Sequence, residues 1–388
     1  MSVTPNEAGT QDLPVVAIIG AGQLGYLLCE AARNCGIQTL VISDADAPAL
    51  QIADDTIVSD YEAPGLAAEI AARAGVVTFE FEAVPDSLLE ALTQESIEVR
   101  PSVEVLRLIK NKARQKAWMV EAGFPTARHI ELTEAEVVSR EFLSDIAPPF
   151  VQKAQEGGYD GYGVQIIHNE SELDKLWPVP SIIERFLDKP RELGVVVARS
   201  ADGSAEVFPT VELLVDQERN ILDMVVAPAP ISAELAAEAE ALSHDVIERL
   251  NSVGVFAVEL FLVGESEILV NEISPRVHNS GHHTIESCTA SQFEQHMRAV
   301  AGLPLKPAEL LKPAVMQNVL CNADVEHLVG RDPGLVAVAN ESVTIHWYGK
   351  KEAREGRKMG HITCVGVEPE QGRAFINETL SGLKQQAG

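Results

Sequence analysis

Two glutamates, Glu259 and Glu272, occupy apolar, β-rich runs at positions where a strand would normally place another hydrophobic side chain. If residues 264–267 form a four-residue turn, Val263 pairs with Ile268 and the two glutamates face each other across a hairpin. Facing carboxylates destabilise a sheet by up to about 1 kcal/mol unless a cation lies between them. A hard divalent ion completed by phosphate oxygens would remove the repulsion, so the pair indicates Mg2+ with a nucleotide. The alternative is a surface hairpin whose two acids point to solvent.

The segment after Glu272 carries more hydrogen-bonding side chains than a plain surface turn needs. Arg276 offers a fixed fork of donors that suits a phosphate or a developing anion. His278 and Asn279, with the backbone near Gly281, could hold a polar substrate. Loops of this kind usually carry function, although a capped turn before a helix predicted over residues 284–302 is a simpler alternative.

The composition restricts what such a site can serve. With 388 residues, 46% of them hydrophobic, the chain is long enough for two or three globular domains. A net charge of -28 disfavours non-specific binding to nucleic acid or to an anionic membrane and favours a soluble protein. An anionic substrate would therefore need a local basic cluster, and one lies near the C-terminus. Five scattered cysteines without metal-ligand spacing indicate thiols in a reducing cytosol.

The N-terminal region begins with a polar stretch, residues 1–12, which we expect to be a disordered tail. A predicted strand at 14–19 is followed by GAGQLG at 20–25, a helix to about Cys35 and a second strand at 38–43 that ends at Asp44. This pattern matches the dinucleotide fingerprint. The same unit serves any α/β domain that brings a backbone close to an anion, and no hydride-transfer residues follow it, so NAD is a minor alternative.

Acidic side chains end the next predicted strand, at residues 76–81. Glu80 and Glu82 lie where open parallel sheets bind ligands, so they could contact a polar or amine-bearing substrate, or they could face solvent. Residues 103–123 then predict an amphipathic helical stretch with a basic polar side, from which Lys112 could reach a nucleotide phosphate.

A lysine and a glycine-rich segment follow. Lys153 ends a predicted strand at 150–153, and GGYDGYG at 157–163 leads into another strand at 164–168. The glycines are not a Walker loop, but a strand lysine beneath a glycine-rich hairpin is how grasp-type folds cover a triphosphate. Residues 181–186 predict the strand and hinge on which adenine could rest, with Glu184 and Glu192 available to its amino group and to the ribose hydroxyls.

This order of elements resembles the ATP-grasp superfamily. The segments that narrow the resemblance are GAGQLG at 20–25, FEFEAVP at 79–85, GGYDGYG at 157–163, NEISPRVHNSGHHT at 271–284, SQFEQHMRA at 291–299 and HWYGKKEAREGRKMGH at 346–361. Together, over about residues 15–361, they resemble the N5-carboxyaminoimidazole ribonucleotide synthetase family of purine biosynthesis. The implied fold is α/β, becoming α+β in the later domains: a three-domain ATP-grasp protein with an N-terminal Rossmann-like parallel sheet.

The resemblance implies an ATP- and Mg2+-dependent ligase that carboxylates 5-aminoimidazole ribonucleotide with bicarbonate through carboxyphosphate. By carry-over, Arg276, His278, Asn279, Tyr159 and Asp160 would be catalytic, and Glu259 with Glu272 would hold the metal. The ATP site would comprise Lys112, Lys153, Gly158, Gly161, Gly163, Glu184, Phe186, Glu192, Asn271 and Glu272. The ribonucleotide would meet Gln23, Leu24 and Glu82 from the first domain and Lys350, Arg357 and Lys358 from the C-terminal basic cluster.

Four positions depart from the family pattern. Tyr162 stands where the family usually has a lysine or arginine, and Val164 where it usually has glutamine. Lys112 replaces an arginine, which substitutes a point charge for a fork, and a histidine that touches ATP in relatives is replaced near Asp216. These changes bear on ATP affinity and on the lid more than on the reaction.

The expected divisions are a Rossmann-like domain at 13–110, a linker helix and lid at 111–190, a catalytic domain at 191–305 and a C-terminal lobe at 306–388. The resemblance further implies a cytoplasmic homodimer with no nucleic-acid or membrane partner. Two other classes stay open: another ATP-grasp ligase, such as the formate-dependent glycinamide ribonucleotide transformylase, and a nucleotide-binding protein without turnover. A dehydrogenase is a distant further alternative.

Overall fold

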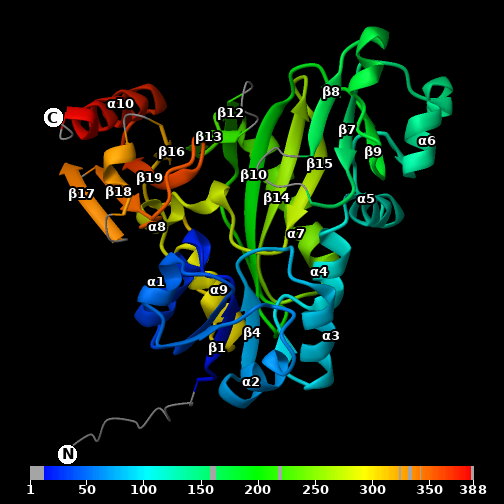
Figure 1. The fold of residues 1–388 in the computed structure, drawn as a ribbon. Helices are drawn as coiled ribbons and strands as arrows, with labels where there is room; N and C mark the ends of the chain where they lie inside the picture. Colours follow the sequence, from blue (N-terminus) through cyan, green and yellow to red (C-terminus); the bar gives the residue numbers. More distant parts are fainter. Residues whose placement is uncertain are drawn as a thin grey trace, which may run out of the picture.

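The computed structural model describes residues 13–157, 163–216, 221–322, 325–330, 334–340 and 342–385. These residues fold around three β-sheets. In Figure 1 the first sheet and its helices lie below, the small sheet lies at the upper right and the large sheet runs from the centre to the C-terminal strands at the left.

The first sheet is parallel, with strand order β3-β2-β1-β4-β5. Its strands are β1 (Val16–Ile19), β2 (Thr39–Ser43), β3 (Asp55–Val58), β4 (Val76–Phe79) and β5 (Glu98–Val99), and its helices are α1 (Gln23–Asn34), α2 (Leu66–Arg73) and α3 (Asp86–Gln94). Every residue of β1, β2 and β4 is buried, as expected for strands covered on both faces. The parallel-sheet N-terminal domain predicted from the sequence is thus confirmed.

A small antiparallel sheet of order β6-β9-β7-β8 follows. It comprises β6 (His129–Leu132), β7 (Phe150–Ala154), β8 (Val164–Ile167) and β9 (Ser181–Arg185), with α6 (Glu134–Ser139) at its side. The helix predicted over 103–123 is instead two helices, α4 (Val103–Ile109) and α5 (Lys112–Glu121). The break occurs because Asn111 is extended and caps α5, its Oδ1 accepting the N–H of Arg114 at 3.0 Å.

The large sheet has the order β15-β14-β10-β12-β13-β16-β19-β18-β17, with β11 paired to β10. Its strands are β10 (Arg191–Arg199), β11 (Ala205–Val207), β12 (Val211–Asp216), β13 (Ile221–Ala227), β14 (Gly254–Val263), β15 (Glu267–Ser274), β16 (Ala314–Leu320), β17 (Gly334–Asn340), β18 (Val343–Trp347) and β19 (Lys358–Val365). Helices α7 (Ala233–Leu250), α8 (Thr284–Ser287), α9 (Gln292–Ala301) and α10 (Pro369–Gln385) accompany it. Because β13 pairs with β16, the sheet continues across the boundary expected at residue 306.

The helix predicted over 284–302 is also interrupted, between α8 and α9. Ser291 is extended and caps α9, its Oγ accepting the N–H of Glu294 at 3.0 Å. Helix α9 then packs between the first sheet and the large sheet. Phe293, Met297 and Val300 share one buried core with β1 and β14 residues such as Val16 and Val255. At about 1.5–3 kcal/mol for each large side chain, this core fixes the two sheets relative to each other.

Among the described residues, no helix combines the length and the hydrophobicity needed to cross a bilayer.

Candidate functional site

The β14–β15 hairpin brings Glu259 and Glu272 face to face, but not by the predicted turn. Val263 pairs with Glu267 and not with Ile268, a register that, if continued, would place Asn271 opposite Glu259. A β-bulge at Asn271 inserts one extra residue and restores the Glu259–Glu272 pair. The predicted turn was therefore wrong, whereas the predicted pairing of the two acids is confirmed. A slip of one residue would otherwise have turned Glu272 to the other face.

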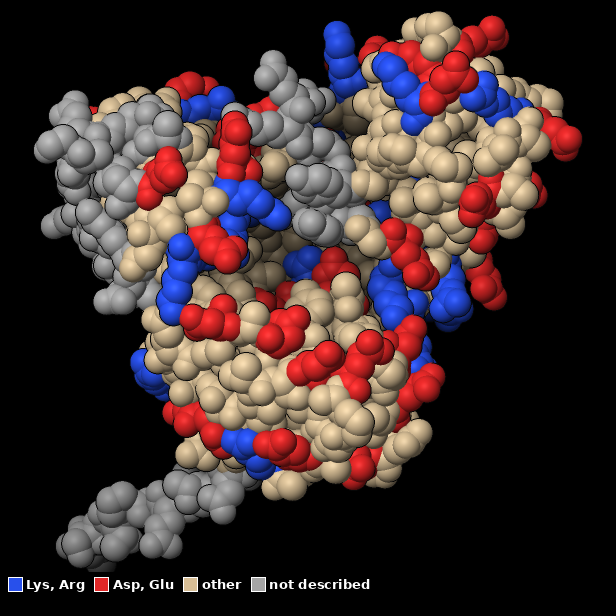
Figure 2. Space-filling model, in the orientation of Figure 1, with Lys and Arg blue, Asp and Glu red and all other residues tan. Residues whose placement is uncertain are grey.

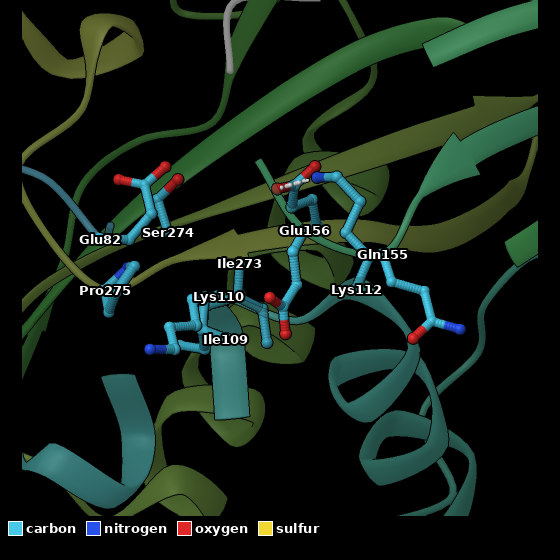
Figure 3. Close-up of a pocket in the computed structure, with 10 residues that line it drawn as sticks. Glu82, Ile109, Lys110, Lys112, Gln155, Glu156, Ile273, Ser274 and Pro275 are labelled. Carbon is cyan, nitrogen blue, oxygen red and sulfur yellow. Dashed lines mark hydrogen bonds and ion pairs between the residues drawn. The ribbon is translucent and has the colours of Figure 1, made fainter. Parts of the chain in front are cut away.

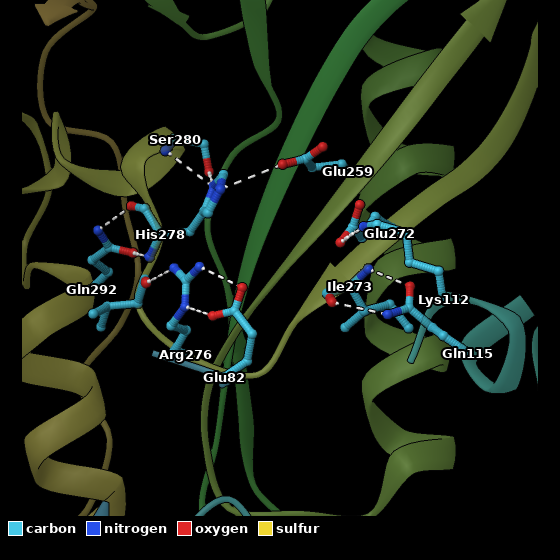
Figure 4. A network of polar contacts seen from close by, with 11 residues as sticks. Glu82, Lys112, Gln115, Glu259, Glu272, Ile273, Arg276, His278, Ser280 and Gln292 are labelled. Carbon is cyan, nitrogen blue, oxygen red and sulfur yellow. Dashed lines mark hydrogen bonds and ion pairs between the residues drawn. The ribbon is translucent and has the colours of Figure 1, made fainter. Parts of the chain in front are cut away.

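Each carboxylate of this pair has a cationic or polar neighbour (Figure 4). Oε1 of Glu272 lies 2.5 Å from Nζ of Lys112. Oε1 of Glu259 lies 3.4 Å from Nε2 of His278. The bulge residue contributes as well, because Oδ1 of Asn271 accepts a hydrogen bond of 2.8 Å from Nζ of Lys153. Six residues predicted for ATP, metal or catalysis are thereby brought together.

The two facing carboxylates repel each other, and this repulsion affects their pKa values. Burial, and then the charges of Glu272 and Glu192, raise the pKa of Glu259 to about 7. Burial also acts to raise the pKa of Glu272, but the charge and hydrogen bond of Lys112 outweigh it and hold that pKa below its ordinary value. A divalent cation between the two carboxylates would stabilise both charged forms, so the residues fit such an ion chemically. No group of three or more His, Cys, Asp or Glu among the described residues could hold a metal, so nucleotide phosphate oxygens would have to complete the coordination.

Beside the pair, two lysines converge on Glu184 of β9. Nζ of Lys153 is 2.8 Å from Oε2 of Glu184, and Nζ of Lys116 is 3.0 Å from its Oε1. All three side chains are buried. Burial would raise the pKa of Glu184, but the two lysines lower it to about 2. The Glu184 carboxylate therefore anchors Lys153 internally, where the sequence had suggested contact with adenine.

Lys116 is a site residue that the sequence analysis missed. Burial lowers its pKa to about 8, although Glu184 opposes the shift. Its Nζ also donates to Oγ1 of Thr126 at 2.6 Å. The available signal was its spacing, since Lys116 lies four residues after Lys112 and so shares its helix face.

On the other side of the pair, Glu82 and Arg276 form a two-pronged ion pair. Nε of Arg276 lies 2.5 Å from Oε2 of Glu82, and Nη2 lies 3.1 Å from Oε1. Burial would raise the pKa of Glu82, but the guanidinium charge lowers it to about 2. The first domain is thus tied directly to the segment that follows β15, while the contact of Glu82 with the ribonucleotide stays a prediction.

The GAGQLG turn does not offer its amides to a nucleotide. The N–H groups of Gly22 and Gly25 both donate to the carboxylate of Glu80, the second at 2.6 Å. A Cβ at Gly20 would run into the Glu80 side chain. Burial raises the pKa of Glu80, although the two amides oppose the shift. The minor alternative of a dinucleotide phosphate at this turn is disfavoured, because a carboxylate of the same chain fills the position.

The remaining predicted residues surround the same region. Gln23 and Leu24, both half-buried, begin α1 beside the Glu80 turn. Lys350 lies 5.7 Å from the ring centre of Tyr348, Arg357 lies 3.7 Å from Glu352, and Lys358 begins β19. Asn279 is buried, and neither its Nδ2 nor its Oδ1 has a hydrogen-bond partner among the described residues, as expected of a side chain that binds a ligand.

A hollow is visible where the three sheets meet, with basic and acidic side chains on its walls (Figure 2). One pocket there spans about 310 Å3 of space, part of which is open solvent. Figure 3 shows its lining, which includes Glu82, Lys110, Lys112, Glu156, Glu272 and Ser274. A second, smaller pocket adjoins Lys112, Lys116, Lys153 and Asn271. The two pockets lie on either side of the Lys112–Glu272 contact.

Part of the predicted lid lies outside the described residues, namely Gly158, Tyr159, Asp160, Gly161 and the departure at Tyr162. Gly163 is described and has a φ of 78°, which favours glycine. Phe186 follows β9 and meets the His168 ring at 6.3 Å, while Glu192 lies on β10, where burial raises its pKa. The charge of Glu192 also acts on Glu259.

Comparisons with known proteins agree with this architecture. Models of three families match the chain: the ribonucleotide synthetase preATP-grasp domain at residues 13–110, the ATP-grasp domain at 117–293 and the phosphoribosylaminoimidazole carboxylase C-terminal domain at 314–374. The N5-carboxyaminoimidazole ribonucleotide synthase of Bacillus subtilis (strain 168) is 36% identical over 357 residues, which cover 90% of this chain and 91% of that protein.

Two solved structures extend the likeness to three dimensions. The ADP complex of an N5-carboxyaminoimidazole ribonucleotide synthetase matches with a TM-score of 0.86 and 32% identity, over 97% of this chain and 98% of the other. An Aspergillus clavatus N5-carboxyaminoimidazole synthase, in complex with ADP and 5-aminoimidazole ribonucleotide, matches with a TM-score of 0.84 and 31% identity, over 97% and 99%. Both the fold class and the resemblance inferred from the sequence are confirmed: the chain belongs to the N5-carboxyaminoimidazole ribonucleotide synthase family of ATP-grasp ligases.

Proposed function

We propose that the protein uses ATP to carboxylate 5-aminoimidazole ribonucleotide with bicarbonate, giving N5-carboxyaminoimidazole ribonucleotide, ADP and phosphate in purine biosynthesis. Family membership supports the reaction, and so does the Aspergillus clavatus relative, which binds ADP and 5-aminoimidazole ribonucleotide. The single observation that carries the proposal is the arrangement around Glu259 and Glu272. Glu272, Lys112 and Glu82 line one hollow, Glu259 faces Glu272 across the hairpin, and Arg276 pairs with Glu82.

The two halves of the reaction correspond to the two sides of this hollow. In the first step, a bicarbonate oxygen attacks the γ-phosphorus of ATP, and ADP leaves to give carboxyphosphate. In the second, the exocyclic amine attacks the carboxyl carbon, the bond to the phosphate oxygen breaks, and phosphate and a proton leave. Lys153 and Lys112 are placed for the anionic phosphates, and Asn271 fixes Lys153. Fixed cations of this kind act by stabilising charge that develops in the transition state.

Mg2+ would be held by Glu259 and Glu272, and when bound it would neutralise phosphate charge. Arg276, His278 and Asn279 would surround the carboxyphosphate, with the unpartnered Asn279 amide available to its oxygens. Glu82, Gln23 and Leu24 would contact the ribonucleotide from the first domain, and Lys350, Arg357 and Lys358 its 5'-phosphate. Glu192 and Phe186 would face the ribose and adenine, and the glycine segment with Tyr159 and Asp160 would cover the ligands.

The same proposal extends to the assembly and to the division of the chain. We expect a cytoplasmic homodimer. We also expect units at 13–110, 111–190, 191–305 and 306–388, with the last two sharing the large sheet. Light scattering coupled to size exclusion tests the oligomeric state, and a monomer at working concentration would contradict it.

The test is phosphate release from Mg-ATP and bicarbonate, with and without 5-aminoimidazole ribonucleotide. We expect stimulation by the ribonucleotide in the wild type and its loss in Glu272→Gln, which keeps the shape of the side chain but removes the carboxylate charge. Glu267→Gln, an exposed position on the same strand, is the matched control and should keep full activity. If the ribonucleotide did not stimulate phosphate release in the wild type, the proposed reaction would be contradicted, and another ligase or a binding protein would be favoured.

A further inference from the structure

Two buried glutamines outside the site hold the segment that carries its reactive side chains. The segment runs from Glu272 to Asn279 and includes Arg276 and His278. One glutamine, Gln115, lies on α5, and the other, Gln292, begins α9. The exposed fraction is 2% for Gln115 and 0% for Gln292. A buried primary amide must satisfy its own hydrogen bonds, and both side chains do so on the backbone of this segment (Figure 4).

Gln115 grips the peptide groups of Ile273, next to Glu272. Its Oε1 accepts the Ile273 N–H at 2.9 Å, and its Nε2 donates to the Ile273 carbonyl at 3.3 Å. The physical need is clear, because β15 is the edge strand of the large sheet. Apart from an isolated bridge between Val270 and Thr126, no strand among the described residues pairs with its outer side, and the amide of Gln115 takes the place of one residue of such a strand.

Gln292 grips His278 at the other end of the segment in the same manner. Its Oε1 accepts the His278 N–H at 2.9 Å, and its Nε2 donates to the His278 carbonyl at 2.6 Å. The Gln292 amide also packs closely against Gly281, where any Cβ would collide with it. The Gln292 backbone N–H is held in turn by Oγ1 of Thr284 at 2.9 Å.

The orientation of the Gln292 amide also fixes a neighbouring histidine. Because its oxygen faces a backbone donor and its nitrogen a backbone acceptor, the amide cannot be flipped. Nε2 therefore also donates to Nδ1 of His282, 3.2 Å away, which leaves the proton of the neutral His282 ring on Nε2. Burial, the first cause, holds the pKa of His282 well below its ordinary value.

We propose that Gln115 and Gln292 are positioning residues, which clamp the two ends of residues 272–279 so that Glu272, Arg276 and His278 meet the reacting groups in one geometry. The inference rests on the proposed function for the identity of those groups. A displacement of about 1 Å can reduce the rate of an oriented reaction by about 100-fold. Because the two glutamines hold the backbone of Ile273 and His278, their loss should lower kcat. Neither glutamine needs to touch a substrate for this role.

The chain supplies a matched control in Gln295, one turn along α9. It is 0% exposed and makes the same pair of bonds on a peptide outside the site. Its Nε2 donates to the Lys306 carbonyl at 2.5 Å, and its Oε1 accepts the Lys306 N–H at 3.0 Å. Replacing any of the three glutamines by methionine keeps the approximate length of the side chain and removes its pair of bonds to one peptide. Gln115 also loses a bond of 3.1 Å to the Ile109 carbonyl and Gln292 its bond to His282, so these two variants should lose somewhat more stability than Gln295→Met.

The experiment compares Gln115→Met, Gln292→Met and Gln295→Met in the full chain. We expect the first two to lower kcat for ribonucleotide-stimulated phosphate release by about tenfold or more, with KM for ATP within about twofold of wild type. Gln295→Met should keep kcat within about twofold, although its urea midpoint should also fall. Equal losses of kcat in all three variants, or none in the first two, would overturn the proposal.

Amide hydrogen exchange gives a second measurement that does not depend on turnover. Exchange should accelerate over residues 272–279 in Gln115→Met and Gln292→Met, and near residue 306 in Gln295→Met. If the wild type shows no ribonucleotide stimulation, the proposed function fails, and exchange alone then decides on the clamps. Unchanged exchange over 272–279 in both variants would show that these glutamines do not hold the segment.

Discussion

At the scale of single residues, Lys112 is the cation on which the carboxylate pair depends in the absence of a bound metal. Burial would lower its pKa, but the Glu272 carboxylate raises it above the ordinary lysine value, so the ammonium stays charged. It stands at 2.5 Å from the oxygen that a metal would use. A divalent cation and the lysine therefore compete for Glu272, and the phosphates of ATP offer Lys112 another anionic partner.

We predict that Lys112→Met binds a divalent cation in the absence of nucleotide more tightly than the wild type does. Removal of the ammonium leaves two facing carboxylates without a counter-charge, and a gain of about 1.4 kcal/mol corresponds to tenfold in affinity. Mn2+ titration followed by electron paramagnetic resonance measures the effect. Lys112→Arg keeps the charge and should bind Mn2+ as weakly as the wild type. Equal affinities in all three proteins would contradict the competition.

The departures from the family pattern also belong to this scale. An arginine fork at position 112 could hold Glu272 and a phosphate oxygen together, whereas a lysine offers one ammonium point. Val164 is the first residue of β8 and is half-buried, and Asp216 is the last residue of β12. None of the three changes disturbs the Glu259–Glu272 pairing. These changes therefore bear on ATP binding and on the lid more than on the pairing of the two carboxylates.

At the scale of elements, α1 begins on a carboxylate and not on a solvent-exposed cap. We predict that Glu80→Ala lowers the free energy of unfolding by about 1–3 kcal/mol, because the N–H groups of Gly22 and Gly25 lose their acceptor. Urea unfolding measures the change. Glu90→Ala, at an exposed position on α3, is the control and should change stability by less than about 0.5 kcal/mol.

Helix α9 joins two sheets through one neutral histidine. Nδ1 of His296 accepts the N–H of Val255 on β14 at 3.0 Å, so its Nε2 carries the proton and donates to Oγ1 of Thr78 on β4 at 2.8 Å. Burial lowers the pKa of His296 to about 3. The unfolded chain, with an ordinary histidine pKa of about 6.5, therefore binds more protons than the folded chain between these two values.

We predict from this difference that His296 contributes stability above about pH 6.5 that is lost as the pH falls toward 3. Between pH 7.5 and 5.5, the wild type should lose about 1 kcal/mol more of its free energy of unfolding than His296→Gln does. Urea unfolding at the two pH values provides the comparison. His244→Gln, on the surface of α7, should leave the pH dependence of the wild type unchanged. The same slope in His296→Gln and wild type would refute the role of His296.

Elements with strong local patterns were predictable, and those decided by distant partners were not. The apolar run at 15–19 and the glycines after it gave β1 and α1 nearly at their true bounds, because burial and turn chemistry are local. The bulge at Asn271 could not be seen, since asparagine in a strand carries no mark of an extra residue. Gln115 and Gln292 were missed because a helical glutamine is usually a surface residue, and only the fold shows that these two meet a backbone edge.

At the scale of the whole molecule, the excess of acidic residues has a consequence for stability. With 58 acids against 30 bases, the charges of the folded chain repel one another on average. Figure 2 shows acidic side chains spread over the first domain and reaching the edge of the central hollow. The basic side chains that the reaction would need are therefore local exceptions, and they are concentrated where the three sheets meet.

We predict that salt stabilises the protein. Raising KCl from 0.05 to 1 M shortens the screening length from more than 10 Å to about 3 Å and should raise Tm by a few degrees, about what 1 kcal/mol gives in a chain of this size. Differential scanning calorimetry at constant pH measures this. Sucrose at matched osmolality is the control for exclusion effects. A fall of Tm with salt would mean that attractive ion pairs, such as Glu82–Arg276, dominate the surface repulsion.

The Glu80 carboxylate on the α1 turn has an evolutionary and a practical meaning. A ligand tethered to its receptor acts at an effective concentration far above that of any dissolved competitor, because it pays no entropy of association. Free dinucleotides and phosphates would therefore have to displace the Glu80 carboxylate, which is part of the same chain. We therefore expect this Rossmann-like domain not to bind such cofactors at the α1 turn. Its strand ends would then be left for a different small molecule, which we propose meets the neighbouring carboxylate of Glu82.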